Sequence, residues 1–484
     1  MKHLLLGTTA LALVGALASF GTARADDQTA QATQTPTQDQ AAPTPPPHPT
    51  VNGVMFSGHI EAGSSFNPDG PNNNINFGQL FTDRANSFGM NQAMLTAEKD
   101  IDSTSANWDW GFKIQGMYGT DARYTHFFNE GDFWTHSPYQ WDIVELNGDM
   151  HFPWMFGGGS TDVKVGQYST PIGYEVIDAT GNTFYTHSYI FNFGIPLKHT
   201  GIQTVNHVTD MLDIWAGVDT GVNASWPDRR YDNNGSLAIL TGFGINNPIP
   251  NLTILGLAHI GPENPYIQGQ SQKFVNGVGV LTPYDPNHAV RQIYDMVTTY
   301  KINDSWSVAN EINFIRDDLA HATAEGAALY GSYAYDDQWT FSARGEVFRD
   351  DQGFFVAAFP ASQDFLTAER GLNQPVRGGG FPLSAYGATG PSGCATTQAG
   401  TCNKATYSEL TIGASYKPPL PPLPLGLGLT IRPEFRWDHA WGMIPNLIAP
   451  NGQRVAAHAF DVNGSGVATK DDQFLFSVDA IFGF

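Results

Sequence analysis

Several features are missing from this sequence, and each absence excludes a class of protein. Beyond the N-terminus no run of about 18 apolar residues occurs, which excludes a helical membrane protein. Basic residues are few: 24 Lys and Arg stand against 46 Asp and Glu, and a formal net charge of −22 excludes a nucleic-acid-binding protein. The hydrolase motifs G-x-S-x-G and H-E-x-x-H are absent. We therefore expect no enzymatic activity and no cofactor.

Cysteine is nearly absent as well. The only two cysteines, Cys394 and Cys402, lie eight positions apart in what we predict to be the longest loop of the chain. In an oxidising compartment such a pair is expected to form a local disulfide that restrains this loop. A metal site is the alternative, but it would need further ligands nearby.

The N-terminus indicates export from the cytoplasm. A basic start at Lys2 is followed by an apolar stretch from 4 to 17, and Ala23-Arg24-Ala25 supplies the small residues of a cleavage site. We interpret residues 1–25 as a signal peptide, with a buried N-terminal helix as the alternative. Cleavage removes two basic residues and no acidic one, which changes the formal net charge to −24.

The next segment, residues 26–50, is rich in Gln, Thr and Pro. It contains too little apolar surface to offset the entropy of ordering, so we predict a disordered tether. Residues 51–484 then form the folded domain, in which Gly and aromatic residues are frequent. Over the whole chain, Gly numbers 52, aromatic residues make up 12% and charged residues only 14%.

Apolar and polar residues alternate with a period of two through most of this domain, which is typical of strands. The last strand is the clearest case: Phe474, Phe476, Val478, Ala480, Phe482 and Phe484 share one face, which is wholly apolar. Strands are predicted near 54–67, 91–102, 108–118, 140–152, 161–171, 201–210, 212–223, 236–246, 252–262, 290–303, 306–317, 326–336, 339–347, 406–417, 429–438 and 472–484. The prediction is 16 strands, with 14 or 18 as alternatives.

The connections between these strands alternate in length. Every second one is mostly short, and the others are mostly long, near 68–90, 122–139, 172–200, 224–235, 263–289, 318–325, 351–405 and 441–471. Short turns on one rim and long loops on the other predict a closed, transmembrane, antiparallel up-and-down β-barrel of the outer membrane. A soluble β-sandwich is the structural alternative. A barrel of this size is too wide for side chains to fill, which favours a water channel.

Three stretches resemble the OmpL-like β-barrel porin family: HIEAGSSFNPDGPNNNINFGQLFTDRAN at 59–86, VKVGQYSTPIGYEVIDATGNTFYTHSYIFNFGIPLKHTG at 163–201, and the ending KDDQFLFSVDAIFGF. The resemblance covers residues 54–484. It implies a Gram-negative outer-membrane porin that is surrounded by outer-membrane lipid, and it does not indicate which substrate the porin takes. In outer-membrane proteins generally a terminal aromatic residue such as Phe484 resembles the signal read by the barrel-insertion machinery. Assembly as a homotrimer is an expectation by analogy.

Two groups of residues are candidates for the pore. In many trimeric porins the third long loop folds into the lumen, and here that loop carries Glu175, Asp178, His187, Lys198 and His199. The lumen faces of the strands offer Lys113, Arg344, Glu346, Arg432, Glu434, Arg436 and Asp438. Fixed charges lining a narrow pore bias which solutes enter. The alternatives are a loop that only caps the barrel and a salt-bridged ladder that stiffens its wall.

One further stretch, DVNGSGVATKDD at 461–472, partly matches a calcium-binding loop. Its candidate ligands are Asp461, Asn463, Ser465 and Asp472. The usual Glu at position twelve and the flanking helices are missing, so we favour an ordinary turn and expect no metal.

We therefore predict an outer-membrane porin for passive diffusion of small hydrophilic solutes or ions, with a mild preference for cations from the negative net charge. The N-terminal tether would lie in the periplasm. Two other functions stay open: a surface adhesin or receptor that uses the 351–405 loop, and an outer-membrane hydrolase with a site assembled from distant strands.

Overall fold

The computed structural model describes most of the chain after residue 49. The described residues are 50–484 without 73, 128–129, 131–137, 156–158, 223, 226–234, 264–270, 276–277, 283–289, 319–321, 352–354, 357–404, 422–423, 442–457 and 463–467. The predicted signal peptide and almost all of the tether lie outside them, as do Cys394 and Cys402. Among the described residues, no helix combines the length and apolar character needed to cross a bilayer.

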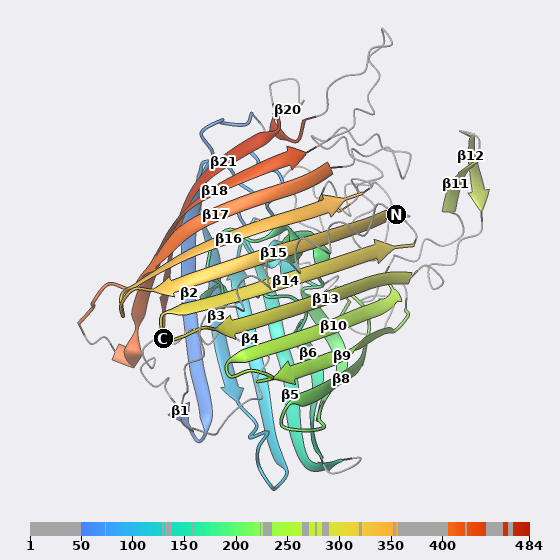
Figure 1. Ribbon diagram of the computed structural model, residues 1–484, viewed down its shortest axis with the longest axis vertical. Coiled ribbons are helices and arrows are strands. Elements are labelled where there is room, and N and C mark those ends of the chain that lie inside the picture. The colour runs from blue at the N-terminus through green and yellow to red at the C-terminus, as the bar shows by residue number, and fades with distance from the viewer. Residues whose placement is uncertain are drawn as a thin grey trace. The chain divides into compact units, whose positions relative to one another are not determined.

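Sixteen long strands form the wall of a barrel (Figure 1). They are β2 (Val54–Phe66), β3 (Ser87–Lys99), β4 (Asp109–Gly119), β5 (Gln140–Met155), β6 (Gly159–Ser169), β7 (Lys198–His207), β8 (Leu212–Asp219), β9 (Ala238–Asn246), β10 (Leu252–Pro262), β13 (Val290–Lys301), β14 (Trp306–Asp317), β15 (Ala322–Ala334), β16 (Trp339–Asp350), β17 (Ala405–Tyr416), β18 (Gly428–Trp441) and β21 (Asp472–Gly483). The smaller elements are β1 (Thr50–Val51), the pairs β11 (Ser271–Val275) with β12 (Val278–Thr282) and β19 (Phe460–Val462) with β20 (Ala468–Lys470), and the short helices α2 (Ala122–Thr125), η2 (Ala179–Gly181), η3 (Ile190–Gly194) and η7 (Pro424–Gly426).

Each long strand pairs antiparallel with the next one along the chain, and the last pairs with the first. In the closing pair, Ile60 lies opposite Phe482 and Phe66 lies opposite Phe476. Closure leaves no strand edge, so every strand of the wall has a neighbour on each side before it meets hydrocarbon. The predicted antiparallel barrel of 16 strands is confirmed.

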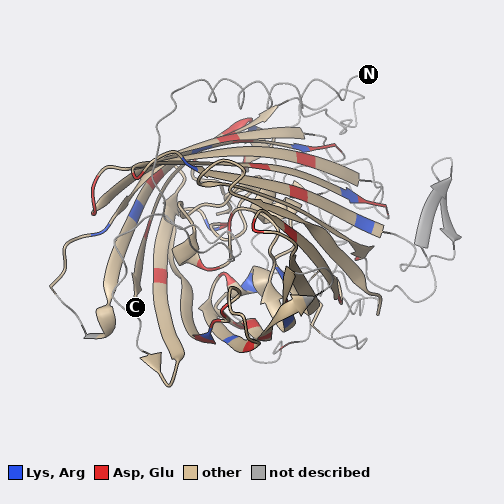
Figure 2. Ribbon diagram, turned by 60° about the horizontal axis from the view of Figure 1, so that its bottom comes forward, with Lys and Arg blue, Asp and Glu red and all other residues tan. Residues whose placement is uncertain are grey.

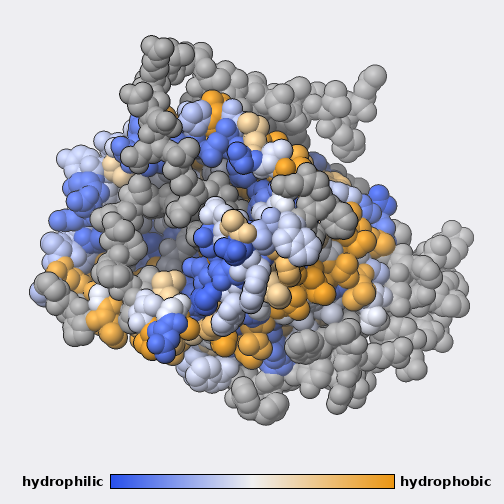
Figure 3. All heavy atoms as spheres, turned by 90° about the horizontal axis from the view of Figure 1, so that it is seen from below, coloured by the Kyte–Doolittle hydropathy of each residue, from blue (hydrophilic) through white to orange (hydrophobic). Residues whose placement is uncertain are grey.

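The two faces of the wall differ as the alternation predicts. On β21, Phe474, Phe476, Val478 and Phe482 are 39–50% exposed, whereas Leu475 between the first two is fully buried. Figure 3 looks at the barrel from below: hydrophobic residues lie along much of its outer rim, and hydrophilic residues gather inside it. An outer apolar surface of this extent matches the acyl chains of a bilayer.

Two strands depart from simple alternation because each contains a bulge. On β3, Glu61 of β2 pairs with Gln92 and the next residue, Ala62, pairs with Met90, so Asn91 is skipped. The outward positions change there from even to odd numbers, since Phe88 and Leu95 are both exposed while Asn91 and Gln92 are both buried. This break explains why the sequence pattern places the start of β3 at 91 instead of 87. The second bulge skips Val144 on β5.

The connections confirm the two rims. On one rim they are mostly short, as between β7 and β8 (207–212) or β15 and β16 (334–339), and on the other they reach from 169 to 198 and from 350 to 405. The described chain both begins and ends on the short-turn rim: Thr50 pairs with Met55, and Phe484 exchanges two backbone hydrogen bonds with Gly58.

Candidate channel constriction

The third long connection, residues 170–197, lies inside the ring of strands, and we call it the inward segment. It leaves the wall at the end of β6 and crosses to the far side, where the backbone N–H groups of Tyr189 and Ile190 donate to Glu346 of β16 at 2.6 and 2.8 Å. Those of Tyr185 and Thr186 donate to Glu434 of β18 at 2.9 and 3.1 Å. Figure 2 shows chain enclosed by the strands in this way. The loop therefore enters the lumen and does not merely cap it.

Three arginines of the far wall clamp the inward segment. Arg344 donates to the Thr186 carbonyl at 2.8 Å, Arg432 to the Asn182 carbonyl at 2.6 Å, and Arg436 to the His187 carbonyl at 2.6 Å. Each also pairs with a wall carboxylate, namely Glu409 at 2.6 Å, Asp479 at 2.5 Å and Asp438 at 2.7 Å respectively. Because all three guanidinium groups are buried, these charges hold the loop in place and do not face open water.

Glu175 is the charged anchor on the segment itself. Its carboxylate accepts from Arg344 and His187, both at 2.7 Å, from the Ser188 N–H at 3.1 Å and from the Tyr330 hydroxyl at 3.1 Å. Burial alone would raise the pKa of Glu175, but the charge of Arg344 and the bond from His187 outweigh it and lower that pKa to about 2. The carboxylate is therefore ionised at neutral pH.

Two further hydrogen bonds complete the attachment of the inward segment on the β13–β14 side. Asn313 of β14 donates to the Gly194 carbonyl at 3.2 Å and to Asp295 of β13 at 3.1 Å. Glu311 accepts from the Tyr174 N–H at 3.2 Å. A Cβ on Gly194 would lie 2.5 Å from Asn313, so glycine permits this close approach.

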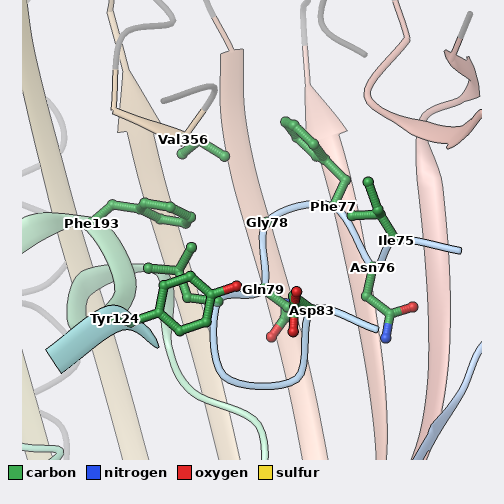
Figure 4. Close-up of a pocket in the computed structure, with 10 residues that line it drawn as sticks. Ile75, Asn76, Phe77, Gly78, Gln79, Asp83, Tyr124, Phe193 and Val356 are labelled. Carbon is green, nitrogen blue, oxygen red and sulfur yellow. The ribbon is translucent and has the colours of Figure 1, made fainter. Parts of the chain in front are cut away.

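A second connection, residues 67–86, also packs inside the barrel. It contributes the buried side chains Phe77, Leu80 and Phe81, and the ring of Phe81 lies 5.3 Å from that of Phe191 in the inward segment. Asp83 forms a two-pronged ion pair with Arg123 of α2, at 2.7 and 3.0 Å. Figure 4 shows the small pocket between this connection, α2 and the inward segment, with Phe77, Tyr124 and Phe193 among its lining residues. The sequence pattern predicts only a long loop near 68–90 here, although the spacing of three and four between Phe77, Leu80 and Phe81 was visible.

The inward segment keeps one water-facing stretch. Between 173 and 183 several residues are partly exposed, and the side chain of Asp178 is 31% exposed. Gln115 of β4 donates to Asp178 at 3.2 Å, and Lys113, two positions nearer the short turns, has a side chain that is also 31% exposed. Burial would raise the pKa of Asp178, but His59, the bonds from Thr180 and the charge of Lys113 lower it, so this carboxylate is anionic.

The lumen wall on the short-turn side is polar and partly exposed. Across β3 to β6 it carries alternating charges, paired as Lys113 with Glu98 at 3.7 Å and Lys164 with Asp149 at 3.3 Å. On the other half of the ring the lumen-facing positions near the short turns include seven hydroxyl residues, Thr253, Thr299, Ser307, Ser332, Thr340, Ser415 and Thr430, and also Lys301, which pairs with Asp304. Figure 3, which views the barrel from below, shows hydrophilic residues inside it. Below the inward segment, the described wall is therefore suited to hold water.

The structure separates the predicted pore residues into three groups. Eight are buried where the inward segment meets the wall: Glu175, His187, Arg344, Glu346, Arg432, Glu434, Arg436 and Asp438. Asp178 and Lys113 are partly exposed to the lumen. Lys198 and His199 are buried at the start of β7, where Lys198 pairs with Asp142 at 2.6 Å. Five buried lumen-side acids were not predicted, although the same alternation could have found them: Glu61, Glu409 and Asp479 pair with the clamping arginines, Glu311 accepts from the inward segment, and Asp295 accepts from Asn313.

The remaining candidates lie elsewhere. Asp461 accepts from Thr469 and lies 3.4 Å from Lys470, and Asp472 accepts from His439 and Trp437, both at 2.8 Å. Asn463 and Ser465 lie outside the described residues, as do the two cysteines and almost all of the 351–405 loop.

The chain is similar to one protein family and, at low sequence identity, to several solved structures. The family model described as "Putative beta-barrel porin-2, OmpL-like" matches residues 53–484. Among solved structures, Salmonella typhi OmpF in complex with daunomycin is 11% identical with a TM-score of 0.48, over 89% of this chain and 97% of that one. The anion-selective porin from Comamonas acidovorans is 9% identical with a TM-score of 0.46, over 89% and 99%. The outer membrane channel DcaP of Acinetobacter baumannii is 9% identical with a TM-score of 0.45, over 89% and 97%. No curated protein sequence matches the chain.

Proposed function

The chain belongs to the OmpL-like family of β-barrel porins and is an outer-membrane channel for solutes, and on this premise we propose that small hydrophilic solutes and ions diffuse through it past Asp178. The observation that carries the proposal is the partly exposed polar surface between the inward segment and the wall of β3 to β6. Asp178 and Lys113 face it from opposite sides, each 31% exposed. Both are charged, so a permeating ion meets one fixed charge of each sign.

Selectivity should follow the partly exposed charges and not the buried ones. Along this surface Glu98 and Asp149 are paired with Lys113 and Lys164, which leaves Asp178 as a carboxylate without a lysine partner of its own. The buried Arg344, Arg432 and Arg436 are neutralised at contact distance and contribute little field to the water. We infer a mild preference for cations.

The test is planar-bilayer recording with the purified barrel, with reversal potentials measured in a KCl gradient. We expect discrete conductance steps and a small cation preference. Asp178→Asn should reduce that preference, and Lys113→Gln should increase it. Thr430→Val, a lumen-facing change without charge on the far wall, is the control. Absence of steps would refute the channel path, and unchanged reversal potentials in both variants would refute the assignment to this surface.

The same proposal assigns the barrel no catalytic activity, since its buried ionisable groups at the constriction are engaged with one another. Purified barrel incubated with phospholipid and casein should release no product. A homotrimer and a periplasmic position for the tether also remain our predictions. Light scattering in detergent tests the trimer, and protease accessibility of residues 26–50 in intact cells against spheroplasts tests the tether; its start at the short-turn rim supports that side.

A further inference from the structure

Two histidines and an aspartate from three different strands meet near the long-loop rim. His199 is the second residue of β7, Asp219 ends β8, and His259 lies near the end of β10. Asp219 is in the middle: its Oδ2 is 3.4 Å from Nδ1 of His199 and 3.2 Å from Nε2 of His259, and its Oδ1 is 3.0 Å from the same Nε2. The three side chains place one ligand atom each within 4.8 Å of the others.

This cluster is fully buried, and two of its ring nitrogens have no hydrogen-bond partner. His199, Asp219 and His259 are at most 1% exposed. Nδ1 of His199 and Nδ1 of His259 each lack a hydrogen bond, although a buried polar atom without a partner costs free energy. The Nδ1 atom of His199 is the one nearest Asp219, so this unused nitrogen is directed toward the centre of the cluster.

Neighbouring groups orient the three side chains through contacts at atoms that do not face the centre of the cluster. Nε2 of His199 is fixed by the Thr170 hydroxyl at 2.9 Å, which leaves Nδ1 for the centre. The Gly221 N–H donates to Asp219 at 2.8 Å. Glu263 lies 3.6 Å from Nδ1 of His259, on the side of the ring away from Asp219. Histidines that bind metals are typically oriented by such contacts at their other nitrogen.

We propose that His199, Asp219 and His259 bind one divalent transition-metal ion of the zinc, cobalt or nickel class. Two imidazole nitrogens and one carboxylate oxygen form a donor set that these ions prefer over calcium or magnesium, which take oxygen ligands. Zinc ligands lie about 2.0–2.2 Å from the ion and hence roughly 3.3 Å from one another. The distances from Oδ2 of Asp219 to the two histidine nitrogens, 3.4 and 3.2 Å, already match this spacing. The two histidine nitrogens, which lie within 4.8 Å of each other, would move closer to each other on binding.

The position gives such an ion a structural role. Thr170 begins the inward segment and His199 follows its end, and the Thr170 N–H also donates to the Leu197 carbonyl at 2.9 Å. Both ends of the inward segment therefore meet at the cluster. An ion bound there would join these ends to β8 and β10 and restrict movement of the segment in the lumen.

Cobalt titration of the untagged, chelator-treated barrel tests the proposal, because the visible absorption of Co²⁺ becomes much stronger when protein ligands replace its hydration shell. The parent is the Cys394→Ser, Cys402→Ser protein, since thiols also bind these ions. We expect one Co²⁺ per chain, displaced by Zn²⁺. His199→Asn and His259→Asn should each lower the affinity at least tenfold.

His207→Asn is the matched control, because His207 is also on β7 and also lies between two carboxylates, Asp162 at 3.1 Å and Asp213 at 2.7 Å. Its affinity for Co²⁺ should equal that of the parent. Folding of each variant is checked by its heat-modifiable migration on gels. The proposal is overturned if the folded parent binds no stoichiometric Co²⁺, if folded His199→Asn and His259→Asn bind as tightly as the parent, or if His207→Asn weakens binding equally.

Discussion

Replacing Arg344 with Met should release the inward segment from the far wall while leaving the barrel closed. The side chain is fully buried and bonds Glu175 at 2.7 Å, Glu409 at 2.6 Å and the Thr186 carbonyl at 2.8 Å. Removing one partner of a buried ion pair costs about 3–5 kcal/mol, because the other charge stays buried without compensation. That shifts the equilibrium between held and released segment by a factor of roughly 10²–10⁴.

Single-channel recording measures this shift. Arg344→Met should spend a large fraction of time at a conductance above the main level of the wild type. Arg316→Met is the control: Arg316 also lies on the wall, but it and its partner Asp318, 2.7 Å away, have side chains 54% and 32% exposed, and pairs open to solvent contribute only about 0–1 kcal/mol. Equal conductance for Arg344→Met and wild type, in a correctly folded variant, would refute the clamp. So would an equal change in Arg316→Met.

Three further predictions concern other parts of the molecule. Because the pKa of Glu175 is lowered from 4.5 to about 2, its contribution to holding the segment is complete above about pH 5 and is lost as the pH falls toward 2. Over that pH range the wild type should spend more time at the higher conductance level, whereas Glu175→Gln should show no such pH dependence. Gly78→Ala should loosen the 67–86 connection and lower the melting temperature, since Gly78 has φ +81° and an added Cβ would lie 2.8 Å from Tyr189. Gly53→Ala is the control for backbone strain alone, because Gly53 also has a positive φ but no atom lies near its added Cβ. Phe484→Ser should lower the amount of barrel assembled in cells without preventing refolding in detergent, and a normal cellular yield would refute its role as an insertion signal.

The alternation of side chains was sufficient to predict the strands, since a two-sided wall forces one polarity on each face. It failed locally at Asn91 and at Val144, where a bulge places two consecutive residues on the lumen side. Whether a bulge forms depends on which distant residues the extra side chain can contact in the folded protein. Asn91 binds Asp121 at 3.0 Å and the Tyr185 hydroxyl at 2.8 Å, partners 30 and 94 positions away.

The constriction was predictable in part. Charged residues on lumen faces, such as Arg432 and Glu434, could be identified from the pattern, but not whether they face water or a loop. That depends on which loop enters, and the sequence carries no periodic signal for a 28-residue connection whose backbone is held by strands more than 150 positions away. The cluster of His199, Asp219 and His259 is likewise formed only when β7, β8 and β10 are aligned.

The central claim, that solutes pass Asp178 on the water-facing side of the inward segment, is tested most directly by modifying that position during recording. In a Cys394→Ser, Cys402→Ser background, a positively charged methanethiosulfonate reagent should permanently reduce the current through Asp178→Cys. It should have no effect on the parent or on Thr186→Cys, whose position is fully buried. An unchanged current through Asp178→Cys, with modification of the thiol verified by mass spectrometry, would contradict the account.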